Sequence, residues 1–425
     1  MVLFSLRRQL VYALLLFVLL LVAVPRAGFE YDVNFWLNWA LHIYENGLGN
    51  TYLEPSNTYN PVFQYVLWLY VQLTANPEKI RHYIHLIKAL VLVFDFAGAF
   101  WAASLVADRT RRFGLVLLLL FNIGYLYDTL IWVQVDAIYS FFAFGAVVLA
   151  AQRRTVLSVL CYVLALGSKT QAIIFLPPLL LLWLPQWWRQ PRQLVQALLA
   201  GAALTTLLLA PFIWGGWQNT LPRIIEFNRQ TDGLLPFISQ HAFNLWLLLF
   251  PADAPLDKMS DQAVYAGLTY HAWGLLLFCT ASAVALLPLL VAGWHTIRRQ
   301  AVGPSLALAL LCCGSIPLLF AFFNTEMHER YWHAAVILLA AYGFQQRDYL
   351  PYILVSIAYF LNLERLFVYL QLDNYHTAIF NPQVIASLFA LDIALIIWKI
   401  YRLAVWHLPA VGVATSPQVL PTVAM

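Results

Sequence analysis

Residues 305–332 read SLALALLCCGSIPLLFAFFNTEMHERYW, an apolar run followed by the polar cluster His328-Glu329-Arg330-Tyr331. A helix needs about 20 mainly apolar residues to cross the hydrocarbon core of a bilayer. Similar runs repeat along the 425-residue chain, in which 62% of residues are hydrophobic and 10% are charged. A soluble domain is only about half apolar. The sequence therefore predicts an all-α polytopic membrane protein with one transmembrane domain over residues 1–406.

Pairs of basic residues flank these runs, namely Arg7-Arg8, Arg111-Arg112, Arg153-Arg154 and Arg298-Arg299. Lys and Arg in short loops mark the cytoplasmic side of a membrane. Placing every pair inside predicts about twelve spans in the cell (inner or plasma) membrane, with both termini cytoplasmic and residues 407–425 as a disordered tail. The net charge is only +4 and the positive residues are scattered between the spans. We therefore expect membrane lipids around the protein and no nucleic-acid partner.

This topology leaves two long external loops, at about 26–84 and 214–270. The apolar spacing from Tyr31 onward predicts an amphipathic surface helix in the first loop. Tyr59–Leu73 is also apolar, but Pro61 and Gln64 interrupt it and it is short for a span. We expect it to be an interfacial helix. As a full span, it would place the Arg111-Arg112 pair outside, against the charge rule.

Three carboxylates fall on the external side, each among aromatic residues: Asp32 in FEYDVNFW, Asp136 in WVQVDAIY and Glu329 in MHERYW. Helix capping is an alternative role for Asp32 and for Asp136, because Asp is favoured at N-caps. A buried Asp136 would need a partner such as Gln134 or Lys169. Lys169 stands at an external span end, where snorkelling is the default. With Thr170 and Gln171 it can instead line a polar pocket.

The 328–331 cluster offers a site for an anion. Arg330 can bind a phosphate through two parallel N–H groups, and His328 can add a donor. A structural ion pair between Glu329 and Arg330 is the alternative. His333 follows His328 by five residues, which is weak support for a metal site. We assign no metal ligand and leave dependence on a divalent cation open. The four cysteines lie in apolar runs, without zinc-type spacing.

The chain resembles the polytopic glycosyltransferases of the GT-C superfamily that use polyprenyl-phosphate sugars. The greatest similarity is to bacterial mannosyltransferases related to the second mannosyltransferase of glycosylphosphatidylinositol synthesis. The elements that carry this resemblance occur in order over about residues 7–344: Asp32 before the Phe35–Trp39 helix, the segment Tyr59–Trp68, Trp132-Val133-Gln134-Val135-Asp136, Lys169 and Gln171, Ala242–Trp246, and His328–Tyr331. Val133 stands where the pattern has glycine.

The resemblance implies an inverting hexosyltransferase, mannosyltransferase-like, that builds cell-envelope glycan at the external or periplasmic face. Its donor would be a polyprenyl-phosphate sugar and its acceptor a lipid or a glycan. Asp32 would be the general base. Arg330, His328 and Lys169 would hold the donor phosphate. The residues expected to orient the substrates are Asp136, Gln134, Glu329, Tyr331 and Gln171.

Two alternatives remain open. A lipid or polysaccharide transporter, or flippase, would use charges within the spans, such as Asp95, Asp392 and Glu364-Arg365. It would also be expected to show an internal repeat, and we find none. An oligosaccharide polymerase or ligase would work at the same face on a diphosphate-linked glycan. One Arg and one Lys suit a monophosphate better than a diphosphate.

Overall fold

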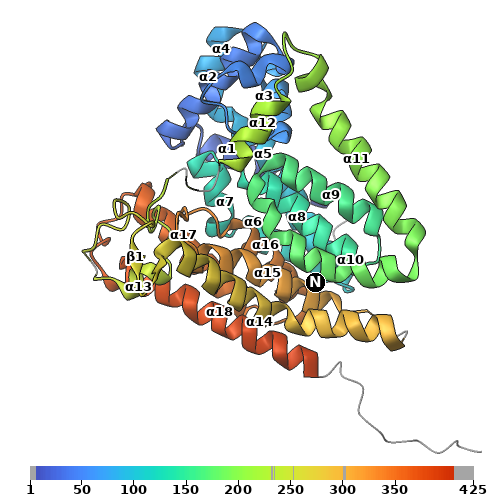
Figure 1. The fold of residues 1–425 in the computed structure, drawn as a ribbon. Coiled ribbons are helices and arrows are strands. Elements are labelled where there is room, and N and C mark those ends of the chain that lie inside the picture. Colours follow the sequence, from blue (N-terminus) through green and yellow to red (C-terminus); the bar gives the residue numbers. More distant parts are fainter. Residues whose placement is uncertain (1–5, 231–232, 234, 252, 300–302, 406–425) are drawn as a thin grey trace, which may run out of the picture.

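The computed structural model describes residues 6–230, 233, 235–251, 253–299 and 303–405, and the predicted tail at 407–425 lies outside them. The fold is almost wholly helical (Figure 1), which confirms the predicted class. The elements up to η3 are α1 Leu6–Ala23, α2 Glu30–Asn46, η1 Leu48–Leu53, α3 Pro61–Thr74, α4 Pro77–Tyr83, η2 Ile84–Leu86, α5 Ile87–Ser104, α6 Arg109–Leu120, α7 Ile123–Tyr127 and η3 Asp128–Trp132.

The remaining elements are α8 Asp136–Ala151, α9 Thr155–Ser168, η4 Thr170–Phe175, α10 Leu176–Arg189, α11 Pro191–Trp214, α12 Leu221–Arg229, α13 Leu245–Leu249, β1 Val264–Tyr265, β2 Leu268–Thr269, α14 Tyr270–Arg299, α15 Leu306–Phe323, α16 His333–Gln346, α17 Leu350–Phe367, η5 Ala378–Phe380 and α18 Pro382–Val405. The two strands pair antiparallel across a two-residue turn, Ala266-Gly267, with φ angles of 49° and 88°. Positive φ at both turn positions is typical of tight hairpins.

The first loop folds into a helical cap on the bundle. Helices α2, α3 and α4 lie together at one end of the molecule, and α11 rises to meet them (Figure 1). The cap coheres through aromatic packing: Trp36 contacts Trp39, Tyr59 and Phe63 with ring centroids 4.8–5.2 Å apart. Trp36, Trp39 and Phe63 are almost fully buried. The amphipathic helix predicted from Tyr31 is present as α2.

In the described part of the chain, eight helices are long and apolar enough to cross a membrane: 6–23, 77–104, 170–189, 191–214, 270–298, 306–323, 350–367 and 382–404. A ninth span results if α6 and the segment Ile123–Trp132, bent by 58°, are counted as one. Several long apolar helices indicate a multi-pass membrane protein, but the predicted twelve spans are not confirmed.

Three of the predicted spans account for the difference between twelve and nine. Residues 138–151, 155–167 and 334–344 are helical, within α8, α9 and α16, but these helices have only 16, 14 and 14 residues. At 1.5 Å per residue they reach about 21–24 Å, short of the ~30 Å hydrocarbon core. The second span also starts earlier than predicted, because α4, η2 and α5 form one run from Pro77 to Ser104.

Helix α3 has 14 residues and is not among the helices that meet the length and hydropathy criteria for a span. Its buried face, which includes Phe63 and Leu67, belongs to the same core cluster as Trp36 and Trp39 of α2. The interfacial position predicted for Tyr59–Leu73 stays a prediction.

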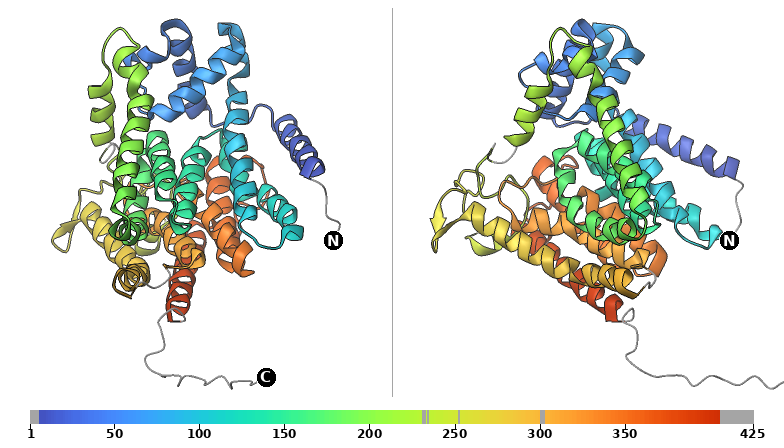
Figure 2. Two further views of the ribbon diagram at one scale, coloured as in Figure 1. Left: turned by 90° about the vertical axis from the view of Figure 1, so that its right-hand side faces the viewer. Right: turned by 45° about the vertical axis from the view of Figure 1, so that its right-hand side comes forward.

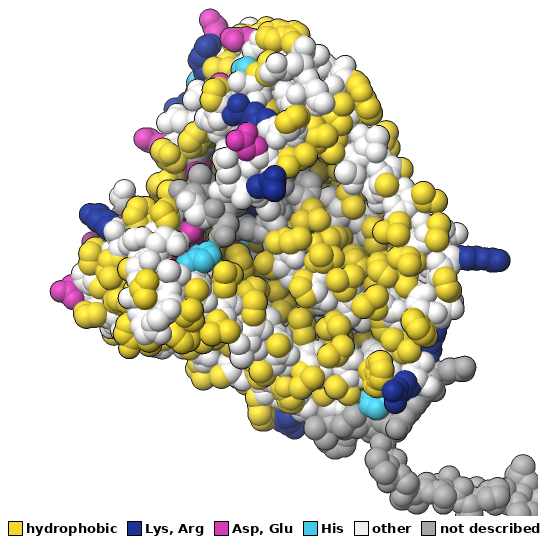
Figure 3. Space-filling view, in the orientation of Figure 1, with side chains coloured by type: hydrophobic (Ala, Val, Ile, Leu, Met, Phe, Trp, Pro, Cys, Tyr) yellow, Lys and Arg dark blue, Asp and Glu magenta, His cyan; other side chains and the backbone are white. Residues whose placement is uncertain are grey.

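Hydrophobic side chains cover a broad face of the molecule over α9, α10 and α14, and charged ones gather near the cap and along the lower margin (Figure 3). Helix α1 stands apart from the bundle (Figure 2), with only 11% of its residues buried. At the end of the bundle away from the cap, Arg153 and Arg189 line a cavity of about 270 Å³ together with Thr296 and Gly303. Basic residues therefore cluster at that end, while the side of the membrane to which it belongs stays a prediction.

Candidate functional site

Three carboxylates and one guanidinium meet where the cap joins the bundle. Arg330, in the turn between α15 and α16, lies at the centre of this group. Its Nη1 is 3.0 Å from Glu329 Oε1 and 3.9 Å from Asp32 Oδ2, and its Nε is 3.8 Å from Asp136 Oδ2. The four side chains are at most 13% exposed. Segments 32, 136 and 328–331, distant in sequence, therefore share one site.

Asp32 is held through a single oxygen. It lies in the first turn of α2, where Phe29 is the N-cap residue, so Asp32 does not cap the helix. Its Oδ2 accepts hydrogen bonds from Trp132 Nε1 at 2.9 Å and from Gln134 Nε2 at 2.6 Å. Every polar contact of Asp32 with the described residues goes to Oδ2. This arrangement leaves Oδ1 available to a substrate.

The donors to Asp32 depend on an unusual backbone turn. The chain leaves α7 through one π-helical turn, η3, and Val133 then adopts a left-handed conformation with φ 65° and ψ 42°. The resemblance expects glycine here, and Val133 keeps the conformation that glycine favours, at a cost of roughly 1–2 kcal/mol. The Val133 carbonyl accepts a hydrogen bond from Trp36 Nε1 at 3.0 Å. Packing thus supports a turn that directs Gln134 toward Asp32.

Asp136 and Lys169 form a second, buried ion pair. Asp136 is the first residue of α8, after Val135 as N-cap, and Lys169 follows the last residue of α9. Lys169 Nζ lies 2.5 Å from Asp136 Oδ1 and within 6 Å of the Tyr139 and Tyr331 rings. Burial lowers the pKa of Lys169, and Asp136 offsets part of that effect. The snorkelling interpretation is wrong, because the ammonium faces into the protein.

Glu329 and His328 complete the charged group. Glu329 is buried, and its Oε2 lies 3.7 Å from His328 Nδ1. Burial raises the pKa of Glu329, but His328 and Arg330 lower it, and the resulting pKa is about 2. Burial lowers the pKa of His328, which favours a neutral imidazole that can donate one hydrogen bond. The expected Glu329–Arg330 ion pair exists, as part of a network with Asp32 and Asp136.

A cavity of about 230 Å³ opens beside this network. Its walls combine the predicted phosphate-binding residues with polar and aromatic residues: Thr58, Tyr59, Asn60, Ser168, Lys169, Thr170, Gln171, Phe227, Gln230, His328, Arg330 and Tyr331. The Gln171 amide is buried there without a hydrogen-bond partner in the described part of the chain. Asp32 is not part of the wall, but Arg330, which lies 3.9 Å from Asp32, is.

An apolar cavity of about 290 Å³ adjoins the polar one. The two cavities share Asn60 and Thr170, and the second extends between α9 and α11 along Val163, Leu166, Leu208 and Leu209. Asn60 Nδ2 donates to the Leu166 carbonyl at 2.7 Å, and Asn228 Nδ2 donates to Asn60 Oδ1 at 2.9 Å. The two cavities thus share part of their walls, and the first has charged walls whereas the second is mostly apolar.

The structure therefore brings together all nine predicted site residues: Asp32, Gln134, Asp136, Lys169, Gln171, His328, Glu329, Arg330 and Tyr331. Sequence reasoning missed the roles of Trp132 as a donor to Asp32 and of Tyr59, whose hydroxyl donates to Gln134 Oε1 at 3.4 Å. Both residues lie in motifs that were recognised. The signal that points to them is that the N–H of Trp and the O–H of Tyr usually find a hydrogen-bond partner when the ring is buried.

The residues considered for transport behave differently from one another. Asp95 is fully buried, and its Oδ1 lies 3.8 Å from His333 Nε2. Glu364 is satisfied by the hydroxyls of Tyr127 and Tyr375 and by the Leu370 N–H. Asp392 is buried, without a hydrogen bond to the described residues.

His328 and His333 do not form the metal pair that their spacing suggested, because they face different carboxylates, Glu329 and Asp95. Within the described ranges, metal-ligand side chains gather instead at Asp261, His271 and Glu326.

A search of protein-family models and a search of curated proteins both found no match for this sequence. The GT-C resemblance thus rests on the residues quoted above.

Proposed function

We propose that this protein is an inverting glycosyltransferase that transfers a sugar from a polyprenyl-phosphate donor to a lipid or glycan acceptor at the external membrane face. The observation that carries the proposal is the pairing of Asp32, fixed through one oxygen, with Arg330, which borders a cavity. Mannose is the sugar favoured by the family resemblance.

The reaction requires one base and one phosphate clamp. An acceptor hydroxyl attacks the anomeric carbon while the bond from that carbon to the phosphate oxygen breaks. The electron pair leaves with the lipid phosphate, and the hydroxyl proton passes to Asp32 Oδ1. The phosphate leaves as an anion and needs no general acid, so cationic N–H donors stabilise the developing charge.

Arg330 is suited to the clamp because its donors are not exhausted. Its Nε has no hydrogen-bond partner among the described residues, and its contacts with Asp32 and Asp136 are longer than hydrogen bonds. A phosphate in the polar cavity would find Lys169 and His328 on the same wall. The adjoining apolar cavity would accommodate the first isoprenoid units of the donor.

Charge balance suggests how donor and base are coupled. The site has one more negative formal charge than positive ones, because three carboxylates (Asp32, Asp136 and Glu329) face two cations (Arg330 and Lys169). A phosphate that draws Arg330 toward the cavity would weaken its attraction for Asp32, and a carboxylate released from a cation is a stronger base. Donor binding would thereby prepare Asp32 for its role.

The test is incubation of the purified protein with polyprenyl-phosphate sugars, with release of free lipid phosphate as the readout. We expect release that depends on the acceptor and is lost in Asp32→Asn. A protein that binds the donor and never releases lipid phosphate, with any sugar or acceptor supplied, would contradict the proposal.

A transporter is the second candidate, favoured by the buried Asp95–His333 contact within the bundle. Transport predicts movement of lipid-linked sugar across proteoliposome membranes without chemical change. It also predicts that Asp95→Asn abolishes movement whereas Asp32→Asn does not.

A further inference from the structure

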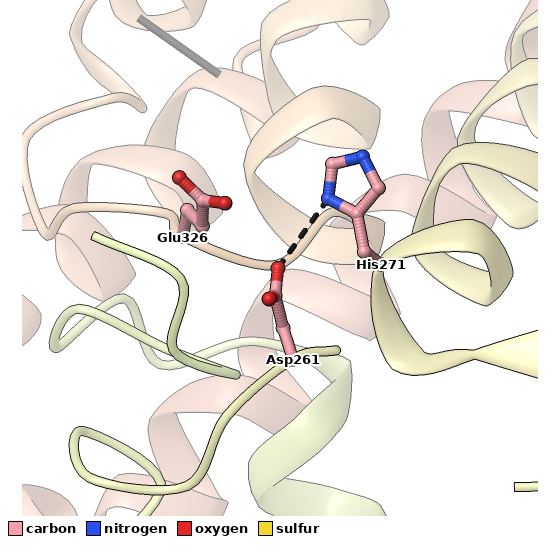
Figure 4. A group of neighbouring side chains, drawn as sticks. All are labelled: Asp261, His271 and Glu326. Carbon is pink, nitrogen blue, oxygen red and sulfur yellow. Dashed lines mark ion pairs between the residues drawn. The ribbon is translucent and has the colours of Figure 1, made fainter. Parts of the chain in front are cut away.

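A second group of ionisable side chains lies outside the site described above, in the loop region beside β1 and β2. Asp261 comes from the segment before β1, His271 is the second residue of α14, and Glu326 lies in the turn after α15. One ligand atom from each residue lies within 4.8 Å of the other two. Figure 4 shows the three side chains approaching from separate segments of the chain.

Asp261 is the buried member of the group. Its carboxylate is fully buried, with Oδ2 accepting a hydrogen bond from Thr325 Oγ1 at 2.7 Å and Oδ1 accepting one from Gln262 Nε2 at 2.9 Å. Its ion-pair contact in the described part of the chain is with His271, whose Nδ1 lies 3.3 Å from Oδ2. A buried carboxylate keeps its charge only when a cation or several hydrogen bonds compensate it.

We propose that Asp261, His271 and Glu326 bind a divalent transition-metal ion, Zn²⁺ or Mn²⁺. Bonds of about 2.0–2.1 Å place neighbouring ligand atoms of a tetrahedral ion about 3.3 Å apart. The Nδ1 to Oδ2 separation of 3.3 Å matches this value. The remaining ligand atoms, within 4.8 Å of one another, need to approach by at most about 1.5 Å to reach the same spacing.

The donor set selects the class of metal. Imidazole nitrogen suits Zn²⁺ and other transition metals, whereas Mg²⁺ and Ca²⁺ prefer all-oxygen ligands. Two carboxylates and one imidazole leave a fourth position for water, as in open three-residue zinc sites. The bound ion would neutralise the charge of buried Asp261.

A metal here would position the candidate active site without touching substrate. It would tie the 261–271 segment to Glu326, two residues before His328. The Met327 carbonyl, between them, accepts hydrogen bonds from the N–H groups of Gln240 and Ala242 at 3.0 and 3.2 Å. Metal binding would thus fix the backbone that leads into the 328–331 cluster. The proposal does not depend on the proposed sugar transfer.

The experiment uses the full-length protein in detergent, stripped of metal by a chelator. Zn²⁺, Mn²⁺, Mg²⁺ and Ca²⁺ are added singly, and Tm is measured. We expect Zn²⁺ or Mn²⁺ to raise Tm by several degrees, with little effect of the other two. Co²⁺ then serves as a spectroscopic probe, because its visible absorption changes on nitrogen and oxygen ligation.

Variants assign the effect to these ligands. Asp261→Asn and His271→Gln should each weaken binding by at least about 10-fold. Asp253→Asn and His376→Gln, which alter exposed residues of the same types, should bind like the wild type.

Two outcomes would overturn the proposal. One is a wild-type protein whose Tm and Co²⁺ spectrum do not respond to any of the ions. The other is a response that persists unchanged in His271→Gln and in Asp261→Asn. If Asp261→Asn fails to fold, His271→Gln decides the proposal. The His271 side chain is partly exposed, whereas that of Asp261 is fully buried, so the protein should tolerate a substitution at His271 more readily.

Discussion

Two sets of acidic residues in this protein differ in the contacts that their carboxylates make. Asp32, Asp136 and Glu329 each lie within 4 Å of Arg330 or Lys169. Asp95 and Asp128, within α5 and η3, are fully buried, and their carboxylates have no hydrogen bond to the described residues. In the first set, breaking a contact strands a charge. In the second, the carboxyl group has no hydrogen-bond partner among the described residues, so its replacement strands no charge.

The largest effect is expected at Asp32. Asp32→Asn keeps the size of the side chain but cannot accept the acceptor proton, so turnover should fall by ~10²–10⁴-fold with donor affinity nearly unchanged. Lipid-phosphate release and donor binding are measured on the same preparation. Glu30→Gln, an exposed acid in the same helical turn, is the control. If Asp32→Asn turned over at the wild-type rate, Asp32 would not be the general base.

Asp136→Asn tests the dependence of the ion pairs on one another. It leaves the Lys169 ammonium buried without its partner, and losing one member of such a pair costs about 3–5 kcal/mol. We expect a clear drop in Tm. The double variant Asp136→Asn/Lys169→Met should recover part of it, because no charge is stranded. Additive losses in the double variant would show that the pair is not coupled.

Arg330→Ala should impair both donor binding and turnover, by about 10²–10³-fold in turnover, because the phosphate is charged in the ground state and in the transition state. Arg330→Lys should rescue only in part, since an ammonium lacks the planar fork. Stability should also fall, because three carboxylates lose a neighbouring cation.

Donor affinity of the folded fraction separates the two roles of Arg330. A destabilised variant with unchanged affinity would make Arg330 structural and Lys169 the next candidate for phosphate binding. Arg229→Ala, at an exposed position on α12, is the matched control.

Glu329 makes stability depend on pH. Its pKa falls from an ordinary value of 4.5 to about 2 in the folded protein. A lowered folded-state pKa contributes stability that is complete above pH ~4.5 and is lost as the pH falls toward 2, here about 3 kcal/mol in all. The Tm difference between wild type and Glu329→Gln should shrink across this window. Glu226→Gln, at an exposed position, should show no such change.

The smallest effect is expected at Asp95. Asp95→Asn removes a carboxylate that makes no hydrogen bond, so stability should change by no more than about 1 kcal/mol or increase. Transfer activity should stay within a few-fold of the wild type. A loss of activity as large as that of Asp32→Asn would instead make Asp95 part of the function, as the transport alternative requires.

Parts of this comparison could be predicted from the sequence. The charge rule placed Asp32, Asp136 and Glu329 on one side because long apolar runs separate them from the Arg pairs. The partners of these residues could not be predicted in the same way. Lys169 looked exposed at a span end, and only the packing of α8 against α9 turns it toward Asp136.

Two features could not be predicted from sequence patterns: the number of membrane spans, and the grouping of Asp261, His271 and Glu326. An apolar stretch such as 334–344 has the same composition whether it faces lipid or lies inside the bundle, so hydropathy alone made α16 a span. Asp261, His271 and Glu326 lie 10 and 55 residues apart, a spacing that no short motif contains. Their proximity arises only when the loop, α14 and the turn after α15 pack together.

Arg330 contacts Asp32 and also lines the polar cavity, and this double contact has a kinetic consequence. If the donor enters through the cavity and the acceptor approaches Asp32 from its other side, the two substrates meet only after the guanidinium has moved toward the phosphate. Such a partition imposes an order of addition, with the donor first and the acceptor second. High acceptor concentrations would then inhibit the enzyme by occupying it before the donor arrives.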